Sequence, residues 1–303
     1  MGLDTPERSA QQATSDMAAP RGRALIERPF QWALLGATLL ALALLAALLA
    51  DVLIDGAGRL SWDFFTDYSD SLDPAETGIR TGLTGTMSLM VLTAAISFPI
   101  GVGAAVYLEE YASDNRFTRL LQLNIANLAG VPSVVYGLLT LSAFVYVLGF
   151  GRSLLAGAMA LSLLILPIII VASREALRAV PQSIRNGALA LGATPLQVTS
   201  RQVLPIALPG ILTGTILALS RAIGESAPIL VVGAVFSRRA DTWPWELFEP
   251  FGALPIQIFN FVRQPEPGFQ IEAASAGILV LLALLLTMNA VAIFLRNRYQ
   301  KRF

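Results

Sequence analysis

The chain has 303 residues, of which 55% are hydrophobic and only 14% are charged, and its formal net charge is zero. Soluble globular proteins carry about 25% charged residues, so this composition is typical of a membrane protein and gives no sign of nucleic-acid binding. Because the sequence has no Cys and no His, it excludes disulfides, thiol nucleophiles, cysteine metal sites and imidazole bases. We therefore expect no catalytic centre, no metal and no cofactor.

The only lysine is Lys301, which is followed by Arg302 and lies in no glycine-rich turn. A P-loop needs such a turn followed by Lys-Ser or Lys-Thr. The sequence therefore predicts a chain that is not an enzyme and that has no ATPase site of this kind of its own.

The N-terminal region combines a polar stretch with a long apolar run. Residues 1–30 show no periodicity, which predicts a flexible tail. The run from Trp32 to Ala50 carries no charge and is longer than the core of a signal peptide. We therefore predict a retained membrane helix over 31–54 and one transmembrane domain over 31–303.

Further apolar stretches follow, each near or above the roughly 20 residues that cross a bilayer. Pro99 predicts a kink in the second stretch, and Gly130-Val131-Pro132 divides the third into a short helix at 117–129 and a span. The sequence thus predicts an all-α integral membrane protein with six transmembrane helices, at 31–54, 81–108, 132–149, 154–173, 206–236 and 273–295.

Six spans place both termini on the same side of the membrane. Most Arg residues lie on that side, in the terminal regions and in the loop between spans four and five. By the positive-inside rule, both termini and this loop are cytoplasmic.

The loop between spans four and five, 183–200, carries clear local signals. An Ala/Leu-rich helix should run from about 182 to 191, and Gly192 should end it in the left-handed conformation. Thr194 should then cap a second helix that has Pro195 at its first position. These signals predict two short helices bent around a glycine, with a small-residue surface on which another protein can pack closely.

This loop resembles the EAA loop of ABC importer permeases, whose motif is Glu-Ala-Ala, three residues, Gly, nine residues, Ile, one residue and Leu-Pro. The glycine matches Gly192 and the third small residue matches Ala188, whereas Asn186, Gly187 and Gln202 replace the Glu, the first Ala and the Ile. The resemblance implies that 183–200 couples the chain to an ATPase subunit. The implied coupling residues are Asn186, Gly187, Ala188, Gly192, Leu204 and Pro205.

Other stretches between about residues 80 and 298 resemble the PstA-type phosphate permeases. They are 130–137, 166–181, 208–214, 219–228 and 253–260. The resemblance implies the type I ABC importer permease fold in a bacterial inner membrane. It also implies phosphate as the cargo and, as partners, a second permease (PstC-like), two ATPase subunits (PstB-like) and an external phosphate-binding protein (PstS-like).

Arg221 and Glu225 are the only charged residues deep in a predicted span. A charge at the centre of a bilayer costs about 2.5–3.5 kcal/mol on insertion scales, so it usually marks a polar pathway. We therefore expect Arg221 to line the substrate path, where its guanidinium matches phosphate, with Glu225 moderating the binding. Alternatively, the two residues are a self-neutralised pair that fixes the helix against a neighbour.

Several other polar residues are candidates for the same path. Arg174, at the cytoplasmic end of span four, would either line the inner exit or serve as an interfacial anchor. Ser133, Tyr136, Gln257 and Asn260 would either donate hydrogen bonds to an anion or join helices to one another.

Three other functions compete with phosphate import. The same architecture would serve another oxyanion, such as sulfate, molybdate or a phosphonate. An intramembrane protease would need His or paired Asp within spans, and the sequence offers neither. A receptor or scaffold without flux would require neither the glycine-bent loop nor the buried charged pair.

Overall fold

The computed structural model describes residues 21–234 and 240–299, and for 21–28, 295 and 299 it gives the backbone only. Residues 1–20 of the tail expected over 1–30 lie outside the described residues, and residues 21–30 are helical. Helix α2 begins at Arg21 and ends at Gly56, and Phe30 to Ala50 within it are almost all apolar. The chain divides into two compact units, 1–52 and 53–303, so most of α2 belongs to the first.

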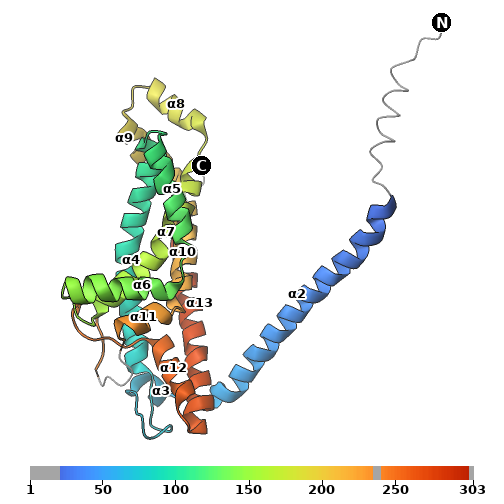
Figure 1. Cartoon of the computed structure of the whole chain (residues 1–303), viewed down its shortest axis with the longest axis vertical. Helices are drawn as coiled ribbons and strands as arrows, with labels where there is room; N and C mark the ends of the chain where they lie inside the picture. The colour runs from blue at the N-terminus through green and yellow to red at the C-terminus, as the bar shows by residue number, and fades with distance from the viewer. Residues whose placement is uncertain (1–20, 235–239, 300–303) are drawn as a thin grey trace. The chain divides into compact units, whose positions relative to one another are not determined.

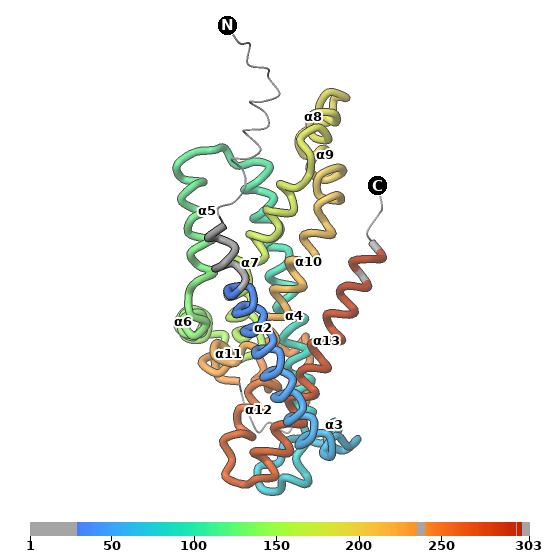
Figure 2. Tube along the Cα trace, turned by 90° about the vertical axis from the view of Figure 1, so that its right-hand side faces the viewer, coloured from blue at the N-terminus to red at the C-terminus, as the bar shows by residue number. Residues whose placement is uncertain are grey.

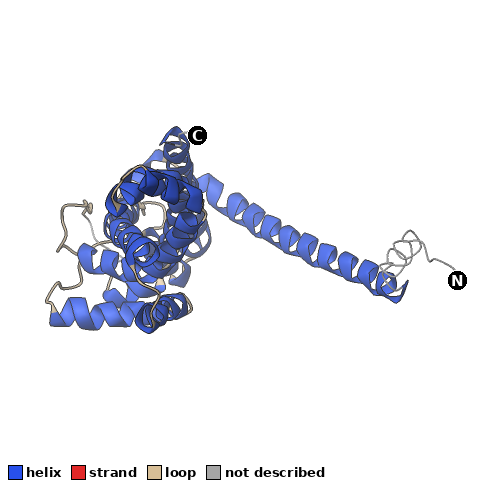
Figure 3. Ribbon diagram, turned by 90° about the horizontal axis from the view of Figure 1, so that it is seen from above, coloured by secondary structure: helices blue, strands red, loops and turns tan. Residues whose placement is uncertain are grey.

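The second unit is built on four long helices: α4 (Arg80–Val106), α7 (Leu154–Arg178), α10 (Leu204–Ile223) and α13 (Ala274–Tyr299). Both α4 and α10 pack on α7, and α10 also packs on α13 (Figure 1). The described residues contain helices and loops but no strand (Figure 3), which confirms the all-α prediction.

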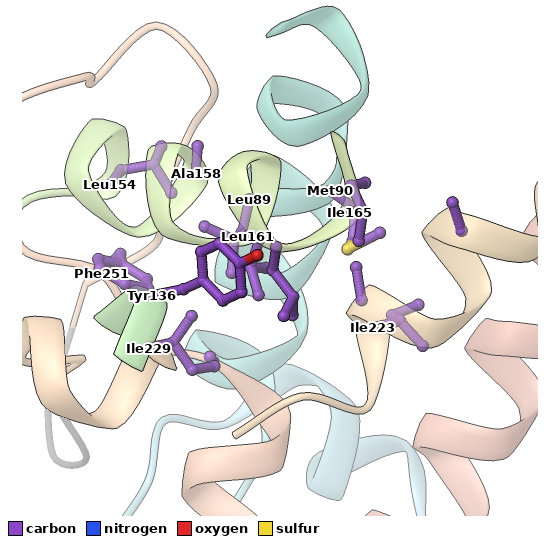
Figure 4. Packing of buried hydrophobic residues seen from close by; sticks show 14 of the residues in the cluster. Leu89, Met90, Tyr136, Leu154, Ala158, Leu161, Ile165, Ile223, Ile229 and Phe251 are labelled. Atoms are coloured by element: carbon purple, nitrogen blue, oxygen red, sulfur yellow. The ribbon is translucent and has the colours of Figure 1, made fainter. Parts of the chain in front are cut away.

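The largest apolar core lies between α4 and α7. Leu89 of α4 and Leu161 and Ile165 of α7 are buried against one another, with Tyr136 and Ile229 closing the cluster (Figure 4). Lipid tails are as apolar as these side chains, so helix association in a membrane depends on close packing more than on the hydrophobic effect.

Close packing of α7 on α10 depends on small residues. Gly210 and Gly214 are one helical turn apart on α10 and face Ala176 and Ala172 of α7. A Cβ added at Gly210 would lie 2.8 Å from the Ala176 Cβ, and one added at Gly214 would overlap the Ala172 Cβ. The glycine spacing thus lets the two backbones approach, as in other membrane helix pairs.

The third predicted span is a bent pair of helices. α5 (Arg116–Leu128) and α6 (Ser133–Thr140), which continues as a π-helical segment to Val147, meet at an angle of 107°. Pro132 lacks an amide hydrogen and Gly130 is a poor helix former, so the helix ends before them. The span expected at 132–149 is therefore only the second arm of this pair.

The fifth predicted span, 206–236, is interrupted. α10 ends at Ile223 and the chain becomes helical again only at α11 (Ala227–Val232), while 235–239 lie outside the described residues. The break follows from Pro228, which cannot donate a hydrogen bond to the carbonyl four residues earlier, at Gly224. α11 then packs closely on α6, where an added Cβ at Gly137 would lie 2.8 Å from the Pro228 Cα.

Short helices lie at the two ends of the second unit. α8 (Gln182–Ala190) and α9 (Pro195–Val198) lie at one end, and α3 (Trp62–Thr66) and α12 (Leu254–Arg263) at the other, with α6 and α11 between them (Figures 1 and 2). Helix α12 was not predicted, although Leu254, Ile258 and Phe261 recur at helical spacing and are buried.

Five helical stretches among the described residues are long and apolar enough to cross a membrane, and the α5–α6 pair makes up to six. They are Pro29–Arg59, Arg80–Tyr111, Leu154–Arg178, Pro195–Ile223 and Gly268–Arg298.

Candidate functional site

The expected glycine bend is present between α8 and α9. Gly192 has a φ of +84°, in the left-handed region. Its amide donates to the Leu189 carbonyl at 2.9 Å, and the Ala193 amide donates to the Ala188 carbonyl at 3.1 Å. These two bonds form a Schellman motif, which satisfies carbonyls that the end of α8 would otherwise leave open. No side chain or backbone atom within 4 Å would oppose a Cβ at Gly192, so the backbone conformation alone selects glycine there.

The second helix of the loop begins as its local chemistry predicts. The Thr194 hydroxyl accepts a hydrogen bond from the Gln197 amide at 3.3 Å, and the Gln197 side chain accepts one from the Thr194 amide at 2.9 Å. This reciprocal capping box, with Pro195 in the first turn, starts α9 with little dependence on the rest of the fold.

The bend presents apolar side chains to its surroundings. Leu191 is 90% exposed, and Leu189 and Leu196 are also exposed. We call α8, the Gly192 bend and α9 the elbow. Exposed leucines gathered at a bend between two capped helices form a surface suited to a protein partner.

The expected coupling residues fall in two places. Asn186 and Gly187 are exposed on α8, Ala188 is half-buried beneath them, and Gly192 forms the bend. Leu204 and Pro205 begin α10, after the π-helical segment Thr199–Val203, so they lie at the root of the elbow rather than on it.

Arg221 and Glu225 lie at the break between α10 and α11. Arg221 is in the last turn of α10, about 25 Å along the helix from Leu204. The Arg221 Nε lies 3.5 Å from a carboxylate oxygen of Glu225, and the Arg221 side chain is 52% exposed. Among the described residues Glu225 is its only ion-pair partner. The guanidinium is therefore held loosely and keeps donors available for an anion.

Arg174 lies elsewhere, near the elbow end of α7. Its guanidinium contacts the Glu109 carboxylate at 3.3 Å, and Arg178 contacts the same carboxylate at 2.8 Å. Glu109 belongs to the π-helical segment Tyr107–Tyr111 that follows α4. The structure thus places Arg174 in an ion-pair cluster under the elbow, not beside Arg221.

Three of the other candidate donors have partners within the fold. The Tyr136 hydroxyl donates to the Leu128 carbonyl at 2.8 Å, and the Asn260 amide donates to the Ile256 carbonyl at 2.8 Å. Gln257 is buried, donates to the Gly78 carbonyl at 2.7 Å and accepts from the Gly82 amide at 3.2 Å. The bonds of Tyr136 and Gln257 join separate segments of the chain, whereas that of Asn260 lies within α12. Ser133 begins α6.

Sequence reasoning missed the carboxylates of the cluster. Glu109 and Glu110 are adjacent in the chain, and their arginine partners are 65 to 75 residues away. The one available signal was their place at the end of an apolar stretch that faces the same side as Arg174, Arg178 and Arg185.

Comparison with protein families gives a match that covers residues 97–303. That family is described as the binding-protein-dependent transport system inner membrane component.

Similar proteins include bacterial permeases. A probable ABC transporter permease protein, YqgI of Bacillus subtilis, is 31% identical over 86% of this chain and 91% of that protein. The phosphate transport system permease protein PstA of Mycobacterium leprae is 34% identical over 86% of both chains. PstA 1 of Mycobacterium tuberculosis is 36% identical over 72% of this chain and 70% of that protein.

Solved structures show the same arrangement of helices. A chain of a bacterial alginate ABC transporter, solved with an alginate pentasaccharide-bound periplasmic protein, covers 93% of this chain and 99% of its own, with a TM-score of 0.67 and 14% identity. A chain of the inward-facing MetNI methionine ABC transporter covers 74% of this chain and 96% of its own, with a TM-score of 0.57 and 17% identity. At these identities the likeness is one of fold.

Proposed function

Because this chain belongs to the binding-protein-dependent transport system inner membrane components, as an ABC importer permease, we propose that its cargo is inorganic phosphate. The chain has the type I ABC importer permease fold and is a multi-pass cell-membrane protein. Its relatives are permease subunits rather than ATPases, so it is a transport subunit.

In this proposal the chain forms the translocation path with a second permease and is driven by two ATPase subunits that dock on the elbow. An external phosphate-binding protein delivers the anion to the opposite end, near α3 and α12. Both termini and the elbow face the cytoplasm, in accord with the concentration of arginines on that side. The exposed leucines of the elbow support docking there.

One structural observation, in addition to the names of the relatives, supports phosphate as the cargo. Arg221 presents a half-exposed guanidinium at the end of an apolar helix, and the carboxylate oxygen of Glu225 lies 3.5 Å from its Nε. A guanidinium can give phosphate two parallel hydrogen bonds. Glu225, four residues along, weakens the hold on an anion, which a carrier needs because it must also release its cargo.

The test is Arg221→Lys in the assembled complex of permeases, ATPase and phosphate-binding protein reconstituted in vesicles. Lysine keeps the charge but loses the planar fork, so phosphate uptake should fall roughly tenfold, the equivalent of about 1.4 kcal/mol. Assembly, followed as co-purification of the ATPase, should not change.

Arg119→Lys is the matched control, because Arg119 is exposed and its ion pair among the described residues is with the exposed Asp114. Full phosphate uptake by Arg221→Lys would contradict the role of Arg221. Phosphate uptake that sulfate, molybdate or a phosphonate suppresses at equal concentration would contradict phosphate as the preferred cargo.

A further inference from the structure

One arginine of the elbow makes polar contacts with two other parts of the bundle. Arg185 lies on α8, and its guanidinium reaches three other places in the chain. It contacts the Glu110 carboxylate at 2.7 Å, and it donates to the Val180 carbonyl at 2.6 Å and to the Leu177 carbonyl at 2.9 Å. One side chain therefore joins α8, the C-terminal end of α7 and the segment after α4.

The geometry of this contact uses features that only arginine has. The guanidinium presents two nitrogens to the Glu110 carboxylate and turns further donors toward the two carbonyls. Leu177 lies in the last turn of α7 and Val180 lies two residues after its end, where backbone acceptors lack the usual helical partners. A lysine ammonium has three donors on a flexible stem and cannot reproduce this planar set of contacts.

This pair and Arg174–Glu109 are the two most buried ion pairs of the described residues. The Arg185 side chain is 13% exposed and the Glu110 side chain 8% exposed. Removing one partner of a buried pair leaves an uncompensated charge, whereas an exposed pair contributes little. The Arg185–Glu110 pair is therefore a firm attachment.

The two adjacent glutamates pair with arginines on different helices. Glu109 faces Arg174 and Arg178 of α7, while Glu110 faces Arg185 of α8. Successive residues on a helix point in different directions, so two neighbouring glutamates can hold two different helices. Ile184 and Ala188 of α8 add partly buried apolar contacts, but none of the α8 residues is fully buried.

We propose that Arg185 is a positioning residue that makes the elbow, the end of α7 and the segment after α4 move as one body. This inference rests on the proposed function, in which an ATPase drives the elbow. Motion imposed on α8 then passes through Arg185 to α7 and to α4. These two helices form the largest core of the bundle.

The primary test compares Arg185→Ala and Glu110→Gln with wild type in the reconstituted complex. The quantity measured is phosphate transported per ATP hydrolysed. Both variants should lower this ratio at least roughly fivefold, while the ATPase still co-purifies and still hydrolyses ATP. Arg185→Lys should give an intermediate ratio because it keeps the charge and loses the carbonyl contacts. Arg119→Ala removes an exposed ion pair and should leave the ratio unchanged.

A distance measurement gives a readout that transport does not. Because the chain has no Cys, Ser113→Cys and Ser183→Cys introduce a unique pair of sites for nitroxide labels on the exposed loop after residue 111 and on α8. Cysteines of the companion subunits are replaced first. With Arg185 present, the distance distribution should be narrow and should not change when ATP is added, whereas Arg185→Ala should broaden it.

The two proposals fail differently. A wild-type complex that takes up no phosphate, or that retains no ATPase, would reject the proposed function. A wild-type complex that is coupled, together with an Arg185→Ala complex whose ratio stays within twofold and whose label distances stay narrow, would reject only the role of Arg185. If Arg185→Ala does not assemble, Glu110→Gln and Arg185→Lys decide by the same two measurements.

Discussion

Gly192→Val should abolish coupled phosphate uptake while the protein still inserts in the membrane. A β-branched residue at a φ of +84° is strained by about 1–2 kcal/mol or more, which disfavours the bend by roughly tenfold or more. The Schellman bonds would then be lost, and α9 would leave its place beside α8. Uptake into vesicles and ATPase co-purification measure the two consequences.

Gly149→Val is the matched control for this experiment. Gly149 has a φ of +70° and, like Gly192, has open space around a would-be Cβ, but it lies between α6 and α7. Similar strain is thus introduced away from the elbow, and uptake should be largely retained. Gly192→Asn should keep more activity than Gly192→Val, because asparagine tolerates the left-handed conformation. Normal coupled uptake by Gly192→Val would contradict the role of the elbow.

Gly214→Ala should destabilise the bundle by about 1–3 kcal/mol, the usual cost of overpacking a tight contact. The new methyl group would overlap the Ala172 Cβ, so α7 and α10 would have to separate. Thermal unfolding in detergent measures the loss. The double variant Gly214→Ala with Ala172→Gly moves the methyl group to the opposite helix and should recover most of the stability.

Gly103→Ala is the control for the glycine substitution itself. Gly103 lies inside α4 with nothing within 4 Å of a would-be Cβ, so alanine there should be neutral or stabilising by up to about 1 kcal/mol. If Gly214→Ala unfolds at the wild-type temperature, or if Ala172→Gly fails to rescue it, the close approach of α7 and α10 does not govern stability.

The elbow is the part of the molecule that sequence reasoning described best. Its signals are local: Gly192 ends one helix, and Thr194 and Pro195 begin the next, all within a few residues. Capping chemistry of this kind acts between neighbours in the chain, so it can be recognised without a tertiary structure. The bounds of α8 and α9 follow from it.

Contacts between residues far apart in the chain could not be predicted from the sequence. Glu110 and Arg185 are 75 residues apart, and no periodicity or motif pairs them. The break after α10 could have been predicted from Pro228. The apolar run from 206 to 236 suggested one continuous span instead. The role of Arg174 could not be predicted either, because its partner Glu109 is far away in the sequence and lies on a different helix.

The break between Gly224 and Ser226 has a consequence for hydration. Among the described residues the Glu225 amide donates to the Ala222 carbonyl at 3.1 Å, whereas Pro228 has no amide hydrogen to offer the Gly224 carbonyl. Hydrocarbon offers no hydrogen bonds, and each unmet backbone group would cost several kcal/mol there. The break lies midway between the two ends of the unit, next to α6 (Figure 1). Water or a neighbouring subunit must therefore supply these partners, so the centre of the resting importer holds a polar contact before any cargo arrives.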